Sequence, residues 1–218
     1  EDLAARYTPL LAKQELEGDF LDIAGAEFPG EWFVNTGYET DPDNVRLRVL
    51  YLDPSMGQNE TSDYSAFVML SLGMNGTLYV DADIDRRDPA TLTKRGLEIC
   101  KTFQPHSFAV ESNGFQRVLA GMMQEQSRLS GLSAPICEVT NHTNKVERIR
   151  CYVTPYLARG EIKFKSGSKG AELLVEQLRQ FPEGDHDDGP DALAGAIRRT
   201  QELFYGGEDG LTFGSVSL

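Results

Sequence analysis

Three groups of acidic residues, far apart in the chain, could carry out chemistry together. Asp53 follows one apolar run, Glu111 follows another, and the cluster Asp187-Asp188-Gly189-Pro190-Asp191 opens a helical pattern. Carboxylates at strand ends and at a helix start can converge in a fold, and a site with oxygen ligands alone favours Mg²⁺ or Mn²⁺ over Zn²⁺. The pattern therefore predicts a divalent metal site and phosphodiester chemistry.

Each group also has a simpler structural interpretation. Asp53 precedes Pro54 and could start a turn, and acids at a helix N-terminus interact favourably with the helix dipole. One acid would be enough for that role, whereas several packed together repel one another unless a cation is present. Glu111 ends a short apolar strand, where glutamate is uncommon. Taken together, the three groups favour a metal site over capping and turn roles.

A two-ion site is the expected arrangement. Two ions about 3.5–4 Å apart would stabilise the attacking and leaving oxygens of an in-line displacement at phosphorus. On this hypothesis Asp53 bridges both ions, Glu111 holds one, and Asp188 or a neighbour holds the other. Asp188 and Asp191 share a helical face, so the choice among Asp187, Asp188 and Asp191 stays open.

The elements that position these residues follow from hydrophobic periodicity. Alternating and then continuous apolar residues predict a central strand over 46–53. The Asn75-Gly76 pair predicts a tight hairpin turn. Further strands are expected at 64–72, 77–81, 107–111, 135–139 and 161–164. Helices are expected at 1–24, 89–104, 144–158, 169–181 and 190–204, with another around 118–123, and Pro155 should kink or divide the fourth of these six in chain order.

The order of these elements predicts the fold class. Three antiparallel strands come first and strand–helix units follow, which is typical of an α/β fold with a mixed sheet flanked by helices, as in an RNase H-like domain. The 218 residues suit one domain. Residues 25–44, with two prolines and several glycines, are interpreted as a connector.

Composition limits the function classes. The net charge of −13 argues against a protein that coats nucleic acid, because such binding depends on Lys and Arg contacts to phosphate. A local basic face over 145–169 remains an alternative to a solvated helix face. The three cysteines lack CxxC spacing, which argues against a structural zinc site. No apolar run is long enough to span a membrane, and residues 1–3 do not resemble a signal peptide.

Four motifs occur in order over residues 46–200. They are Leu52-Asp53-Pro54 with Asp63-Tyr64-Ser65-Ala66, then Ala109-Val110-Glu111-Ser112-Asn113-Gly114, then Asn144-Lys145-Val146-Glu147-Arg148-Ile149, then Phe181-Pro182 with His186-Asp187-Asp188-Gly189-Pro190-Asp191-Ala192-Leu193. Together they resemble the C-terminal nuclease domain of the large terminase subunits of tailed bacteriophages. The resemblance implies an RNase H-like endonuclease, dependent on Mg²⁺ or Mn²⁺, that cuts double-stranded concatemeric phage DNA during genome packaging.

The resemblance also implies roles for individual residues. The metal ligands of the family correspond to Asp53, Glu111 and the cluster Asp187, Asp188 and Asp191, among which Asp188 is favoured as the third catalytic residue. Two further residues are candidates for support or proton transfer, Asp63 and His186. Two cations are expected to contact the scissile phosphate or the DNA backbone, Lys145 and Arg148.

One departure from the family concerns ATP. Large terminase subunits carry an N-terminal ATPase motor, but this chain has no GxxxxGK[ST] loop, and Gly167-Ser168-Lys169-Gly170 lacks its spacing. We therefore expect no ATPase activity in this chain. Residues 1–45 are expected to be a helix and linker left from a missing motor domain, 46–205 the nuclease domain, and 206–218 a flexible tail.

The expected setting is the cytoplasm of an infected host cell, without a membrane. Double-stranded DNA is the expected partner, and in the full protein the ATPase domain, the small terminase subunit and the portal. Two alternatives remain open: a junction resolvase or transposase nuclease of the same fold, and a non-catalytic packaging module that docks on the portal.

Overall fold

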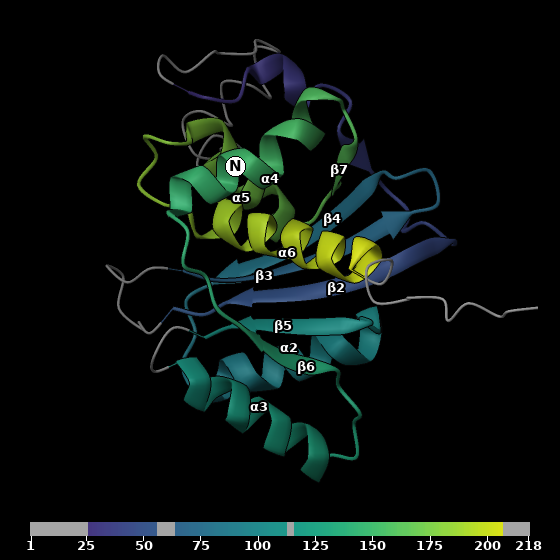
Figure 1. The fold of residues 1–218 in the computed structure, drawn as a ribbon, viewed down its shortest axis with the longest axis vertical. Coiled ribbons are helices and arrows are strands. Elements are labelled where there is room, and N and C mark those ends of the chain that lie inside the picture. Colours follow the sequence, from purple (N-terminus) through teal and green to yellow (C-terminus); the bar gives the residue numbers. More distant parts are fainter. Residues whose placement is uncertain (1–25, 56–63, 113–115, 207–218) are drawn as a thin grey trace, which may run out of the picture.

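A mixed sheet forms the centre of the computed structural model, which describes residues 26–55, 64–112 and 116–206 (Figure 1). Its seven strands lie in the order β1-β7-β4-β3-β2-β5-β6. They span Gly37–Tyr38 (β1), Val45–Asp53 (β2), Ser65–Gly73 (β3), Leu78–Asp85 (β4), Ser107–Glu111 (β5), Ile136–Val139 (β6) and Ile162–Lys165 (β7).

The pairing directions confirm the predicted mixed sheet. β2, β3 and β4 are antiparallel neighbours, and the β3–β4 turn places Gly76 at a φ of 86°, a backbone conformation that glycine adopts readily. β5 and β6 continue from β2 in parallel, and β7 and β1 continue in parallel from β4. β2 and β5 are therefore parallel neighbours whose C-terminal ends share one edge of the sheet.

Helices cover both faces of the sheet (Figure 1). The core on one face includes α4 (Lys145–Ala158), α5 (Lys169–Gln180) and α6 (Asp188–Tyr205), with a short 3₁₀ helix, η2 (Gly30–Phe33). The core on the other face includes α2 (Pro89–Phe103) and α3 (Gln116–Leu129). Helix α6 crosses the middle of the sheet and packs on β2 and β3. Among the described residues, no helix is both long and apolar enough to cross a membrane.

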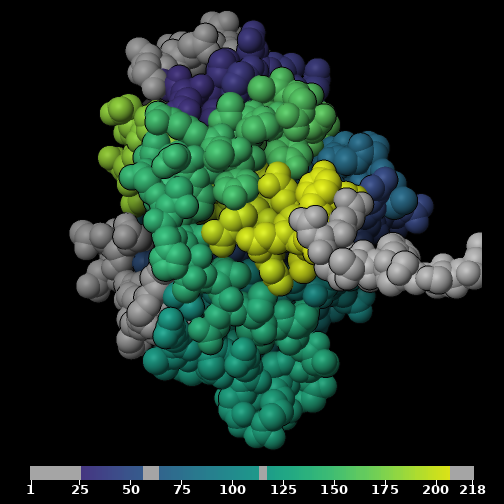
Figure 2. Space-filling view, in the orientation of Figure 1, coloured from purple at the N-terminus to yellow at the C-terminus, as the bar shows by residue number. Residues whose placement is uncertain are grey.

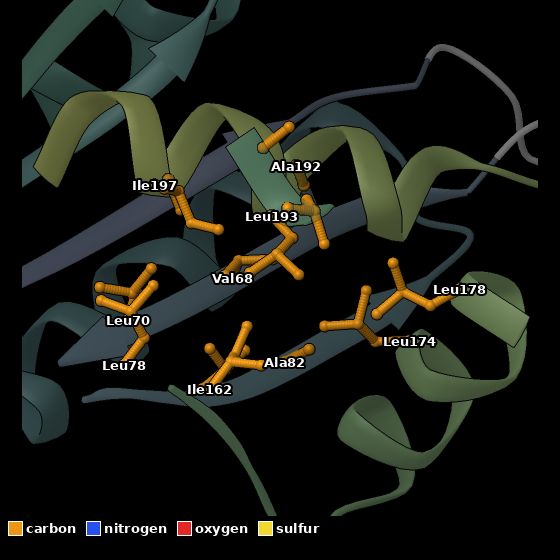
Figure 3. Packing of buried hydrophobic residues seen from close by; sticks show 14 of the residues in the cluster. Val68, Leu70, Leu78, Ala82, Ile162, Leu174, Leu178, Ala192, Leu193 and Ile197 are labelled. Atoms are coloured by element: carbon orange, nitrogen blue, oxygen red, sulfur yellow. The ribbon is translucent and has the colours of Figure 1, made fainter. Parts of the chain in front are cut away.

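Strand β2 shows why the sequences of the central strands are continuously apolar. Leu50 and Leu52 belong to the core under α2, whereas Tyr51 belongs to the core under α6, and all three are fully buried. Successive strand residues point to opposite faces, so a strand covered on both sides is apolar throughout. On the α6 face, Leu193 of α6 packs with Val68 of β3 (Figure 3).

The segment interpreted as a connector contributes to the core. Phe28 is buried and its ring stacks on Phe181, with centroids 5.5 Å apart. Phe33 is also buried, and β1 extends the sheet beside β7. A two-residue strand is too short to show a period of two, which is why the sequence did not predict it.

Three further differences concern element bounds. α4 is one helix through Pro155, because the proline lies in the last turn and removes a single hydrogen bond near the helix end. β4 continues to Asp85, and α6 begins at Asp188, ahead of Pro190. The helix predicted at 1–24, the tail after 206 and the position of Asp63 lie outside the described residues.

Candidate metal centre

Two of the predicted site residues come together through strand register. Leu52 of β2 pairs with Val110 of β5 in a parallel ladder, so Asp53 and Glu111 follow at the same edge. Because side chains alternate along a strand, Asp53 shares the face of Tyr51, two residues earlier, which is the face that α6 covers. The fold thus directs both carboxylates toward α6, which packs on β2. In the space-filling view α6 (yellow) lies beside α4 (green) near the middle of this face of the molecule (Figure 2).

The third carboxylate of the cluster comes from α6. One carboxylate oxygen each of Asp53, Glu111 and Asp191 lies within 4.8 Å of the other two. Asp191 lies in the first turn of α6, where its backbone N–H donates to the Asp187 carbonyl over 3.0 Å. Glu111 and Asp191 are buried and Asp53 is partly buried. Three elements that are distant in sequence therefore supply one compact acidic cluster.

Burial and mutual repulsion outweigh the nearby cations at Asp53 and Asp191. Burial raises the pKa of Asp53 well above its usual value, and the nearby charges of Glu111 and Asp191 raise it further. Burial also raises the pKa of Asp191, although Arg148 acts in the opposite direction. A divalent cation bound among these oxygens would offset both burial and repulsion. The donor set, carboxylate oxygen alone, fits Mg²⁺ or Mn²⁺.

Lys145 lies near all three acids at the start of α6, Asp187, Asp188 and Asp191. The Lys145 Nζ lies 2.6 Å from Asp187 Oδ1, 3.5 Å from Asp188 Oδ1 and 3.7 Å from Asp191 Oδ2. Burial alone would lower the Lys145 pKa, but the hydrogen bond to Asp187 and the three carboxylate charges outweigh burial and raise it. This ammonium is therefore a fixed positive charge beside the acidic cluster.

Asp188, expected as the third catalytic acid, lies next to the cluster with other partners. Its Oδ2 accepts a hydrogen bond from the Tyr64 backbone N–H over 3.1 Å. The ring of Tyr64 in turn packs edge-on against His186, with centroids 4.8 Å apart. The structure groups Asp191, rather than Asp188, with Asp53 and Glu111. A direct metal contact by Asp188 or Asp187 stays a prediction, as does proton transfer by His186.

Arg148, expected to contact DNA, lies inside the protein. It is 5% exposed, and its Nε donates to Asp191 Oδ1 over 2.8 Å while its Nη1 donates to the Thr143 carbonyl over 3.1 Å. This geometry orients Asp191 within the cluster.

Acids neutralise part of the rest of the basic stretch over 145–169. Three of its cations form ion pairs, Arg150–Glu27, Arg159–Glu161 and Lys165–Asp41.

Two residues that the sequence did not single out support Glu111. The Tyr51 hydroxyl donates to Glu111 Oε2 over 3.1 Å, and Asn141 Nδ2 donates to the Tyr51 oxygen over 3.2 Å. Burial, followed by the Glu111 charge, raises the pKa of Tyr51. The sequence could have indicated Tyr51, because a residue two positions before Asp53 on a strand points to the same face of the sheet. Asn141 follows β6 at the edge where Glu111 ends β5.

No family model and no curated protein matches this sequence. Among solved structures, the HK97 bacteriophage large terminase superposes with a TM-score of 0.53 at 11% identity, over 77% of this chain and 42% of that one. Thermus thermophilus RuvC superposes with a TM-score of 0.44 at 14% identity, over 73% of this chain and 97% of that one.

A third solved structure is the fowlpox virus resolvase in complex with Holliday junction DNA. It superposes with a TM-score of 0.45 at 9% identity, over 72% of this chain and 99% of that one. At these identities the likeness concerns the fold. The likeness to the HK97 bacteriophage large terminase, together with the strand order above, shows that the chain has the mixed α/β fold predicted from the sequence, an RNase H-like fold.

Proposed function

We propose that this chain is a metal-dependent endonuclease of the terminase large-subunit type, which cuts double-stranded concatemeric phage DNA during genome packaging. The observation that carries this proposal is the meeting of Asp53, Glu111 and Asp191 within 4.8 Å at one edge of the sheet. Three acids from three elements, two of them held by Tyr51 and Arg148, exceed what a helix cap or a turn requires. The RNase H-like fold and the order of the four sequence motifs support the same proposal.

The residues of the chain have distinct roles in this proposal. Asp53, which lies within 4.8 Å of both Glu111 and Asp191, is the expected bridging ligand. When bound, two Mg²⁺ or Mn²⁺ ions would supply the charge that polarises an attacking water and stabilises the leaving 3′ oxygen. Arg148 holds Asp191 in place. Lys145, whose side chain is 33% exposed, is the proposed contact to the DNA phosphate.

The proposed partners follow from the resemblance. Double-stranded DNA is the substrate, and the ATPase domain, the small terminase subunit and the portal are the partners of the full protein in the host cytoplasm. The chain spans 42% of the length of the HK97 large terminase, and it lacks a phosphate-binding GxxxxGK[ST] loop. We therefore propose that ATP hydrolysis is carried out outside this chain.

Cleavage of supercoiled plasmid with Mg²⁺ or Mn²⁺ tests the proposal. We expect nicking and linearisation by the wild type and a loss of at least about 100-fold in Asp53→Ala, Glu111→Ala and Asp191→Ala, because each removes a ligand of the site. Glu125→Ala is the matched control, since Glu125 is an exposed acid of α3 paired with Arg128. Asp188→Ala in the same assay decides whether Asp188 also acts in catalysis.

Three results would contradict the proposal. Cleavage by purified Asp53→Ala at the wild-type rate would remove the acidic cluster from the reaction. A strong preference for four-way junctions over linear duplex would favour a resolvase. A wild type that binds packaging components but never cuts DNA would favour a non-catalytic packaging module.

A further inference from the structure

A directional chain of hydrogen bonds leads from the loop after β6 to the acidic cluster. Asn141 Nδ2 donates to the Tyr51 oxygen, and the Tyr51 hydroxyl donates to Glu111 Oε2. The Tyr51 side chain is fully buried. The hydroxyl proton is thus committed to Glu111, and the phenol oxygen is held from its other side.

The same tyrosine also contacts α6 directly. A Cβ built on Gly195 would lie 2.2 Å from Tyr51 Cζ and 2.6 Å from its hydroxyl oxygen, closer than real Cβ atoms approach. The phenol therefore occupies the space that any other residue at position 195 would need. The bare backbone of Gly195 lets α6 lie close to β2 at this point.

Two periodicities place the acids relative to this contact. Asp191 precedes Gly195 by four residues, about 6 Å along a helix. Asp53 follows Tyr51 by two residues on the same face of β2, about 6.6 Å along a strand. These nearly equal steps allow Asp191 to meet Asp53 when Gly195 lies against Tyr51.

We propose that Tyr51 is a positioning residue for a divalent cation held by Asp53, Glu111 and Asp191. Its hydroxyl fixes the Glu111 carboxylate, and its ring sets the distance between α6 and β2, and with it the position of Asp191. The inference rests on the proposed function in one respect: the ligand of the cluster is a divalent metal. Partners that orient a metal ligand typically change metal affinity or activity about 10- to 100-fold when removed.

Tyr51→Phe separates the hydroxyl from the ring. Phenylalanine keeps the contact to Gly195, while Glu111 loses the hydrogen bond from the Tyr51 hydroxyl. We expect the apparent Kd for Mn²⁺, followed by the electron paramagnetic resonance signal of the free ion, to rise about 10- to 100-fold. Cleavage should require correspondingly more Mn²⁺ and recover toward the wild-type rate at saturation, with little change in the KM for DNA.

Tyr156→Phe is the matched control. Tyr156 accepts a hydrogen bond from Gln201 over 3.3 Å, between α4 and α6 and outside the acidic cluster. The Tyr156→Phe variant therefore loses a tyrosine hydrogen bond that does not involve Glu111. Its Mn²⁺ affinity should equal that of the wild type. Asn141→Ala provides a second variant that leaves the buried ring in place, and it should weaken Mn²⁺ binding in the same direction by a smaller factor.

The outcomes separate this inference from the proposed function. A wild type that binds no Mn²⁺ and cuts no DNA would end both. A wild type that binds and cuts, together with Tyr51→Phe and Asn141→Ala proteins of unchanged Mn²⁺ affinity, would overturn the positioning role alone. If Tyr51→Phe fails to fold, the Mn²⁺ affinity of Asn141→Ala decides.

Discussion

At the residue scale, Asp53 is placed where its charge is unfavourable without a cation. Burial and the charges of Glu111 and Asp191 all disfavour its ionised form. Few positions that serve only a fold combine these features, because buried charges are normally paired. Functional sites often retain such arrangements at a cost in stability.

Replacing this charge should therefore stabilise the protein while removing its activity. Asp53→Asn keeps the shape of the side chain and removes the repulsion. We expect the melting temperature in EDTA at pH 7 to rise by about 2–4 °C, the shift that ~1 kcal/mol produces in a domain of this size. The same variant should lose plasmid cleavage. A melting temperature below that of the wild type would show that the favourable charge of Lys145 outweighs burial and repulsion at Asp53.

Lys145 supplies the opposite charge to the same region, and its removal should make the site more dependent on metal. In Lys145→Met, Asp187, Asp188 and Asp191 lose their common ammonium partner. We expect the melting temperature in EDTA to fall by about 2–4 °C, equivalent to ~1 kcal/mol, and the increase on adding Mn²⁺ to exceed that of the wild type.

Lys94→Met, at an exposed position of α2 on the other face of the sheet, is the control for Lys145→Met. Equal Mn²⁺ responses in Lys145→Met and the wild type would argue that this ammonium and the metal do not compensate the same acids.

At the element scale, the strand pattern predicted more of the site than the helix pattern did. The apolar runs ending in Asp53 and Glu111 placed both residues correctly at strand ends, and parallel pairing then brought them to one edge. The acids of α6 were harder to distinguish. Asp188 and Asp191 are three residues apart and share a helical face, so the sequence pattern does not distinguish them. Their contacts in the fold do, because Asp188 accepts a hydrogen bond from Tyr64 and Asp191 accepts one from Arg148. Such contacts join residues more than 40 positions apart and have no local signature.

The close approach of α5 to the sheet yields a prediction about stability alone. A Cβ on Gly170 would lie 1.9 Å from the Ala82 carbonyl oxygen of β4, so Gly170→Ala must push α5 away from the sheet. We expect a loss of about 1–3 kcal/mol in the free energy of unfolding, measured with urea.

Gly121→Ala is the matched control for Gly170→Ala. Gly121 also lies in a helix, α3, but among the described residues no heavy atom from outside its own stretch of helix lies within 4 Å of the place that an alanine Cβ would take. There alanine should stabilise the protein by about 0.5–1 kcal/mol through helix propensity. Equal free energies of unfolding for the two variants would contradict the inferred backbone contact.

At the scale of the whole molecule, contacts between residues far apart in the chain determine features that local sequence patterns did not predict. Residues 26–38 contain no long periodic run, yet Phe28 and Phe33 are buried and β1 pairs with β7, more than 120 residues away. The sequence allowed one basic face over 145–169, but two of its cations, Arg150 and Lys165, form ion pairs with Glu27 and Asp41, more than 120 residues earlier in the chain. Local pattern predicts elements well, whereas the partners of charged residues depend on the assembled fold.

The acidic cluster should also make the stability of the whole molecule depend on pH and metal together. The raised pKa values of Asp53 and Asp191 mean that the folded state binds protons more tightly than the unfolded state. Stability should therefore fall as the pH rises from the usual Asp value of 3.8 through these raised values. Mn²⁺, which binds the ionised acids of the folded state, should oppose this fall.

Thermal unfolding between about pH 4 and 8, in EDTA and in millimolar Mn²⁺, tests this coupling. The net charge of −13 also lowers stability as acids ionise, so the decisive quantity is the difference between wild type and Asp53→Asn. We expect this difference to be small near pH 4 and to grow with pH in EDTA. Mn²⁺ should raise the melting temperature of the wild type at pH 7 and that of Asp53→Asn much less, because the variant lacks the proposed bridging ligand. A pH dependence that is the same for both proteins, and unaffected by Mn²⁺, would rule out the cluster as a metal-responsive centre.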